Sequence, residues 1–209
     1  MARGFKRRDG RFVAKLDAVE RGLVVGLMEQ VLELVEPEPV ADPETTDGDE
    51  FDRIVAGLGG IGMGVSLSAS DQLPELSGSV PQPRDPALER IFPTANREDE
   101  QVAAEFRRLT EDGLRARKAA NLTTAITALS AFDDQKVTLE QPQALALLIA
   151  LTDVRLVLGE RLGLKQDDDM ELLEEQVSGL EDDDPAVYAL AVYDFLTWLQ
   201  ETLAHALAP

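Results

Sequence analysis

The stretch from Pro142 to Leu162 limits the fold more than any other feature of the sequence. It is predicted to be one helix that starts at a proline and stops before Gly163. Its interior is apolar on nearly every side, through Leu145, Leu148, Ile149, Leu151, Val154, Leu156 and Leu158. A helix that is apolar all round must be covered by other elements, so we predict that it forms the centre of a helical core.

Apolar residues at helical spacing predict the elements that cover this helix. One helix follows Asp17, which has the capping-box spacing to Glu20, and ends before Pro37. Others are predicted over 51–58, 86–92, 98–132, 167–177 and 186–207. Gly113 is a candidate break within 98–132. One side of that region is predicted to carry Val102, Phe106, Leu109, Leu114, Leu122, Ile126 and Leu129.

Two short segments, 10–16 and 136–139, have the composition or alternation of strands. The sequence therefore predicts a mainly α fold of about five to seven helices, with a minor two-stranded β ribbon. We expect one domain over 1–209. An exposed loop rich in proline and acids is predicted near 36–50, and a long irregular connection near 59–85.

Charge and composition exclude several classes of protein. The formal net charge of −20 repels phosphate backbones over most of the surface. The chain has no cysteine, which excludes disulfides, thiolate nucleophiles and iron–sulfur clusters. The longest charge-poor stretch, 141–151, is far below the roughly 20 residues that span a bilayer, so we predict no membrane partner and a cytoplasmic location.

No catalytic, cofactor or metal site is predicted. The GLGGIG segment over 57–62 matches a dinucleotide-binding pattern by letter, but no strand precedes it. The acidic runs 167–169 and 182–184 lack EF-hand spacing and are better explained as charges at helix N-termini. His205 is the single histidine and has no second histidine or cysteine to join it in a site.

Two sets of charged residues are the candidates for a special role. Asp153 and Arg155 interrupt the most apolar helix and Asp194 interrupts the last one, so we predict a buried ion-pair network that joins Arg155 to Asp194 or to Asp153. The candidate partner-binding residues lie on consecutive helical turns and are Arg107, Arg108, Arg115, Arg117 and Lys118. Together with the basic N-terminus, they form the candidate anion-binding surface.

Three stretches of the sequence carry a resemblance to a known family. They are RDPALERIFPTANREDEQVAAEFRRLTEDGLRARKAAN at 84–121, LTDVRLVLGERLGL at 151–164 and YDFLTWLQETL at 193–203. The chain resembles the actinobacterial AosR-like family, formerly a domain of unknown function, whose genes tend to lie beside the Clp protease adaptor gene. The resemblance implies a transcriptional regulator of the oxidative-stress response. The family's regulation involves cysteine oxidation, which cannot apply to a chain without cysteine.

The leading hypothesis is therefore a regulator without catalysis that contacts a sigma factor or RNA polymerase. One alternative is direct binding of DNA through the basic N-terminus and the 107–118 helix face, which the net charge disfavours. A second alternative is a link to the function of the Clp protease adaptor. A third is an enzyme that uses the carboxylates of Asp153 and Asp194, which would need both residues to line a pocket. A homodimer through the last helix, with Phe195 and Trp198, also remains open.

Overall fold

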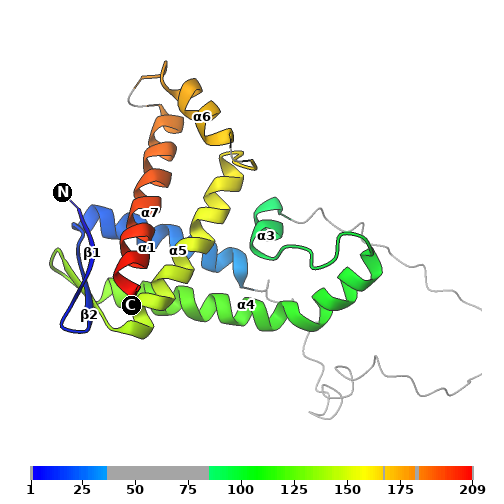
Figure 1. Cartoon of the computed structure of the whole chain (residues 1–209), viewed down its shortest axis with the longest axis horizontal. Coiled ribbons are helices and arrows are strands. Elements are labelled where there is room, and N and C mark those ends of the chain that lie inside the picture. The colour runs from blue at the N-terminus through cyan, green and yellow to red at the C-terminus, as the bar shows by residue number, and fades with distance from the viewer. Residues whose placement is uncertain (1, 37–84, 167, 182–183, 209) are drawn as a thin grey trace, which may run out of the picture. The chain divides into compact units, whose positions relative to one another are not determined.

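The computed structural model describes residues 2–36, 85–166, 168–181 and 184–208. Within these residues the fold is mainly α, with six helices and a three-stranded antiparallel sheet (Figure 1). The elements are β1 (Arg3–Arg8), β2 (Arg11–Lys15), α1 (Ala18–Val35), α3 (Pro86–Ile91), α4 (Glu100–Ser130), β3 (Lys136–Leu139), α5 (Gln141–Arg161), α6 (Asp169–Val177) and α7 (Pro185–Leu207). The predicted fold class is confirmed. The predicted helix 51–58, the glycine segment 57–62, and the loops near 36–50 and 59–85 lie outside the described residues, apart from Glu36 and Asp85.

The sheet has one strand more than the sequence analysis predicted. β2 and β3 are the two predicted strands, and they pair antiparallel with Phe12 opposite Leu139. β1 adds to the other edge of β2 through a tight turn at Asp9 and Gly10, whose φ angles are 51° and 78°. Two consecutive positive φ angles are typical of a type I′ hairpin turn, for which Asp-Gly is a preferred pair. That dipeptide was the signal that would have predicted β1.

The predicted central helix, α5, lies at the centre of the described core. It contacts α1, α3, α4 and α7, and Leu147, Ala150 and Leu151 are fully buried. Of the described helices, α5 alone has the length and hydropathy of a membrane span. Its contacts with four other helices account for that apolar composition as that of a core helix, so a membrane role has only weak support.

Local capping explains where the helices begin. The Asp17 carboxylate accepts hydrogen bonds from the backbone of Val19 and Glu20, and Glu20 in turn accepts one from the Asp17 backbone at 2.8 Å. This reciprocal capping box starts α1 where the sequence predicted it. Asp85 and Asp184 cap α3 and α7 in a similar way, each directly before a proline.

Helix α4 differs from its prediction in two respects. It continues through Gly113 without a break, as one helix of 31 residues. Leu122 and Leu129 are buried as predicted, whereas Val102, Phe106 and Leu109 are 52%, 51% and 67% exposed. The physical reason is helical phase. Val102 and Leu122 are about 5.6 turns apart, so they point to nearly opposite sides and cannot belong to one stripe.

The N-terminal strand and the last helix lie against each other. β1 contacts α7, and the backbone N–H of Phe5 donates a hydrogen bond to Thr202 Oγ1 at 3.1 Å. Phe5 is buried, as are Leu199 and Leu203 of α7. Figure 1 shows the N-terminal hairpin beside the C-terminal end of α7. This packing holds the inner face of the sheet on the helices and leaves the outer face free of them.

Candidate functional site

Four of the five candidate bases on α4 form ion pairs within the chain. Arg107 and Arg115 lie on either side of Glu111, with nitrogen–oxygen distances of 3.7 and 2.8 Å. Arg115 also donates a hydrogen bond to the carbonyl of Val35 at 2.8 Å, and its guanidinium lies 5.0 Å from the centre of the Phe92 ring. These contacts attach α4 to the end of α1 and to the segment after α3, and the carboxylate of Glu111 offsets one of the two positive charges.

Arg108 and Arg117 are the exposed members of the candidate set, and they differ in position and in pairing. Arg108 pairs with Glu105 at 2.7 Å on the exposed side of α4, and this contact lowers the pKa of Glu105. Arg117 is exposed and donates only a long hydrogen bond of 3.3 Å to the Gly113 carbonyl. Arg108 and Arg117 are nine residues apart, about two and a half turns, so they project from opposite sides of α4. Arg107, Arg108, Arg115 and Lys118 lie within about 100° of one another around the helix, so Arg117 alone departs from the predicted face. The other four bases all form ion pairs within the described residues.

Lys118, the fifth candidate base, forms a partly buried ion pair with Asp153 of α5. The Lys118 Nζ atom lies 2.6 Å from Asp153 Oδ1, and Asp153 is only 1% exposed. Burial raises the pKa of Asp153, although the hydrogen bond and the charge of Lys118 act in the opposite direction. The second carboxylate oxygen of Asp153 is buried and accepts no hydrogen bond from the described residues. This pair joins α4 to the central helix of the core at a cost in desolvation.

The predicted network of Asp153, Arg155 and Asp194 has different partners in the structure. Arg155 donates to Gln200 Oε1 at 2.7 Å and lies over the ring of Tyr193 at 5.2 Å. Asp194 is exposed and forms no ion pair with a described residue. The structure thus corrects the pairing, because two residues on one helix separated by a single position, such as Asp153 and Arg155, cannot face each other.

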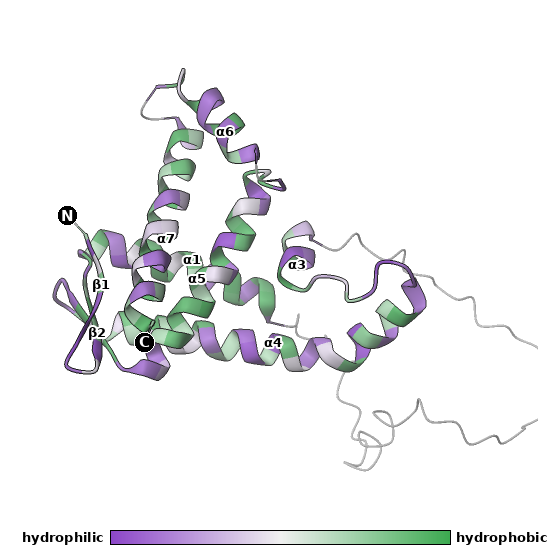
Figure 2. Ribbon diagram, viewed as in Figure 1, coloured by the Kyte–Doolittle hydropathy of each residue, from purple (hydrophilic) through white to green (hydrophobic). Residues whose placement is uncertain are grey.

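The outer face of the small sheet carries a second set of bases, which we call the basic sheet face. The cross-strand register places six exposed side chains on this face, opposite the buried Phe12 and Leu139. They are Arg3, Lys6, Arg8, Arg11, Lys15 and Lys136. Figure 2 shows β1 and β2 mostly in the hydrophilic colour. The inner face of the same strands packs on the core. Alternation along each strand therefore places the core-packing side chains on one face and the bases on the other.

Like charges stand directly opposite each other on this face. The register pairs Arg3 with Lys15, Arg8 with Arg11, and Lys15 with Lys136. Among the described residues, the one ion pair made by the six bases is between Arg11 and Glu140, at 3.2 Å with both side chains about 60% exposed. Like charges directly opposite on a sheet are destabilising, by up to about 1 kcal/mol per pair. Apart from the pair of Arg11 with Glu140, the described residues offer no carboxylate that offsets this repulsion.

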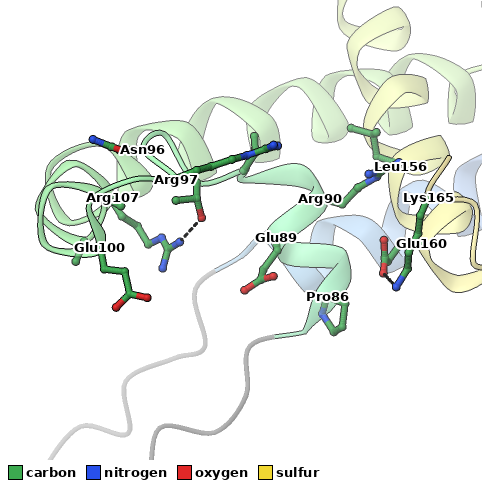
Figure 3. A pocket seen from close by; sticks show the side chains of 14 residues that line it. Pro86, Glu89, Arg90, Asn96, Arg97, Glu100, Arg107, Leu156, Glu160 and Lys165 are labelled. Atoms are coloured by element: carbon green, nitrogen blue, oxygen red, sulfur yellow. Dashed lines mark hydrogen bonds and ion pairs between the residues drawn. The ribbon is translucent and has the colours of Figure 1, made fainter.

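A polar cavity of about 940 Å³ opens between α3, the start of α4 and the end of α5. Its lining mixes charges of both signs: Arg90, Arg97, Arg107 and Lys165 with Glu89, Glu100 and Glu160. Figure 3 shows Arg97, Arg107 and Glu100 on one side, and Arg90, Glu160 and Lys165 on the other. This lining has no excess of one sign large enough to select an ion.

A smaller and more apolar cavity of about 340 Å³ adjoins the first, and Phe92, Phe106 and Leu114 are among its lining residues. Neither Asp153 nor Asp194 lines these two cavities. The alternative of an enzyme based on those carboxylates gains no support from either cavity. Within the same residues there is also no cluster of three or more histidine, aspartate or glutamate side chains that would hold a metal ion.

Comparison with protein families gives one match. The model of the family described as Domain of unknown function (DUF2017) matches residues 2–207. The chain belongs to this family. Comparisons with curated proteins and with solved structures gave no match.

For this DUF2017 chain, the family assignment covers all the described elements, including the β1 strand that the sequence analysis missed. The bases of β1 were noted in the sequence as a basic N-terminus. Their arrangement on one face was not predicted, because it depends on the hairpin turn and on the register with β2. The Asp9–Gly10 pair and the alternation after it are the signals that specify both.

Proposed function

We propose that this DUF2017 protein is a cytoplasmic regulator of transcription that has no catalytic activity and binds an acidic surface of a sigma factor or of RNA polymerase. The observation that carries the proposal is the basic sheet face, with its three like-charge cross-strand pairs and its single exposed ion pair. An acidic partner would relieve this repulsion on binding. The repulsion that destabilises the free protein would therefore add to the free energy of binding in the complex. The resemblance to the AosR-like family supports the choice of partner.

A protein partner is favoured over a nucleic acid for two reasons. The sheet face presents Val13 and Thr138 between its bases and no aromatic side chain, so it offers no platform on which nucleotide bases would stack. The formal net charge of −20 also opposes the approach of a long phosphate backbone beyond the sheet itself. A compact acidic patch on a protein matches the small size of the face and avoids that long-range repulsion.

The test compares two triple variants that lose the same charge. In the sheet variant, Lys6→Thr, Arg8→Thr and Lys15→Thr remove bases from exposed strand positions with a residue that favours strands. In the control, Arg97→Gln, Arg161→Gln and Lys165→Gln remove three exposed bases that lie outside both the sheet and the 107–118 candidates. The wild type and each variant are immobilised on a sensor surface, and their affinity for purified RNA polymerase core and for individual sigma factors is measured at low and moderate salt. Duplex DNA is tested separately in the same way.

We expect the sheet variant to lose at least about tenfold in affinity for the protein partner, because several charge pairs are removed together. The control should stay within about threefold of the wild type, and the wild-type affinity should fall as salt rises. Equal loss in both variants would show that net charge, and not the sheet, determines binding. If duplex DNA binds and the proteins do not, direct DNA binding replaces this proposal. The absence of any binding by the wild type removes support for a regulator of transcription.

A further inference from the structure

The outer side of α4 carries a second regular pattern, distinct from the residues that pack on the core. Six exposed residues recur with alternating spacings of four and three: Val102, Phe106, Leu109, Gly113, Ala116 and Ala120. Thr123 and Thr127, which are also exposed, continue the same spacing. All eight residues are apolar or small. We call this set the outer α4 stripe.

Most of the stripe faces away from the rest of the described fold, while Phe106 at its edge also lines the smaller cavity. The opposite side of α4 packs on α1 and α5, where Leu122, Ala125 and Leu129 are buried. Figure 1 shows α1 and α5 on one side of α4. The large stripe residues Val102, Phe106 and Leu109 lie within about two turns of one another, whereas exposed apolar residues are ordinarily scattered singly.

Gly113 gives the stripe a feature that the monomer does not explain. A glycine inside a helix costs about 0.5–1 kcal/mol relative to alanine. A Cβ atom added at Gly113 would meet nothing within 4 Å among the described residues, so no contact with them requires the glycine. A close approach by another backbone would require it, and the small residues Ala116 and Ala120 extend the same narrow surface by two further turns.

Alternating spacings of three and four form the heptad repeat of a helix that pairs with another helix. A second copy of α4 supplies a partner with the same repeat, the same length and the same narrow region around Gly113. We propose that two copies of this protein associate through the outer α4 stripe, with the two α4 helices parallel. This inference concerns a different surface from the basic sheet face, and it does not depend on the proposed function.

Charges beside the stripe select the parallel arrangement. Asp112 lies on one flank of the stripe and Arg117 on the other, and within the described residues neither forms an ion pair. They are five residues apart, the spacing at which charged flanks of parallel helices meet across the interface. Each would then reach the other on the partner copy, which gives two symmetric pairs. In an antiparallel pair, flanks of the same kind would meet, and Asp112 would face Glu105 or Asp112 of the second copy.

The size of the stripe sets the expected strength. Residues 102–127 span about 39 Å of helix, and a helix is about 10 Å wide, so the footprint is on the order of 400 Å² per copy. Stable complexes bury about 800 Å² per partner. We therefore expect a weak dimer whose population depends on concentration, and not a permanent one.

The first experiment measures oligomeric state by sedimentation velocity over a wide range of concentration. The wild type should shift from monomer to dimer as concentration rises. Leu109→Gln should move the dissociation constant upward by at least about tenfold, because a large apolar side chain in the interface becomes polar. Leu172→Gln is the matched control on α6, where the side chain is 53% exposed, and it should behave like the wild type.

The second experiment tests the direction of the helices. Asp112→Arg and Arg117→Asp should each weaken the dimer, and the double variant should restore it, because the charge pair is recreated in reverse. Because the chain has no cysteine, Ala120→Cys introduces a single reporter. Parallel helices bring the two Cys side chains together, so mild oxidation should give a disulfide-linked dimer, whereas Thr124→Cys, further from the contact line, should link less.

Either experiment can overturn the proposal. A wild type that remains monomeric at the highest concentration removes it directly. A dimer that is unaffected by Leu109→Gln places the interface elsewhere, for example on α7. If the double charge variant is no better than the single variants and Ala120→Cys does not link, the parallel arrangement is wrong even though a dimer exists.

Discussion

The bases of α4 and the bases of the sheet carry the same charge, but their surroundings differ. On α4, Arg107 and Arg115 share Glu111, and Lys118 is bound to the buried Asp153. On the sheet, bases stand opposite other bases, and the exposed Glu140 is the one carboxylate paired with them in the described residues. The first set stabilises the fold through internal pairs. The second set destabilises it slightly and remains available to a partner.

This difference shows why a run of charge in a sequence does not locate a binding surface. In the sequence, residues 107–118 and the N-terminal residues are equally basic. Glu105 and Glu111 pair with bases one turn away on the same helix, at spacings that the sequence shows, whereas packing alone brings Asp153 of α5 to Lys118. Charges are therefore free to bind a partner only where they have no counter-charge within the chain. The variants below alter either the bases of α4 or the bases of the sheet.

The largest expected effect is on the α4 side, at Lys118. Lys118→Met leaves Asp153 buried without its cation, and breaking a buried pair in this way costs about 3–5 kcal/mol of folding stability. The free energy of unfolding is measured with urea at neutral pH. The double variant Lys118→Met with Asp153→Leu should recover most of the loss, because no buried charge remains. A single variant as stable as the wild type would mean that the pair is not formed in solution.

A smaller effect is expected in the pH dependence of the same variant. Burial raises the pKa of Asp153 above its usual value of 3.8, so the folded state holds this proton to a higher pH than the unfolded state does. Removal of Lys118 raises the pKa further. The stability lost in Lys118→Met should therefore be small near about pH 4 and should grow as pH rises toward about pH 8. Urea unfolding across this range tests the trend, and a loss that is independent of pH would contradict it.

The smallest expected effect has the opposite sign and lies on the sheet side. Lys15 stands opposite both Arg3 and Lys136, so Lys15→Thr removes two like-charge contacts. We expect stability to rise by about 0.5 kcal/mol at low salt, and the gain to shrink as salt screens the repulsion. Arg117→Gln, an exposed base on α4, should change stability by less than about 0.5 kcal/mol. A sheet destabilised by Lys15→Thr would show that the bases support the fold.

The sequence predicted the elements whose signals are local. Helix α1 follows from the Asp17–Glu20 capping box, α7 from Asp184 and Pro185, and the position of α5 in the core from its continuous apolar surface. These signals lie within a few residues of the feature that they specify, so no tertiary contact is needed to interpret them.

The features that were mispredicted depend on phase or on long-range contacts. Apolar residues of α4 were assigned to one stripe, although their spacing over five turns places Val102 and Leu122 on opposite sides. The partner of Asp153 is 35 residues away on another helix, and the sequence offers several cations at comparable positions. The basic sheet face required the register between strands that are more than 100 residues apart. The partner-binding role of the α4 bases stays a prediction, with fewer free charges to support it.

The contact between β1 and α7 also has a consequence for synthesis of the chain. The hydrogen bond from Phe5 to Thr202 joins residues 197 positions apart. A growing chain emerges from the ribosome with β1 first among the described elements and α7 last, and domains fold as their segments become available. The β1 strand of the hairpin, which carries half of the basic sheet face, thus lacks its main helix contact until α7 has been made. The surface proposed to bind a partner is therefore the last part of the described fold to be completed in each new molecule.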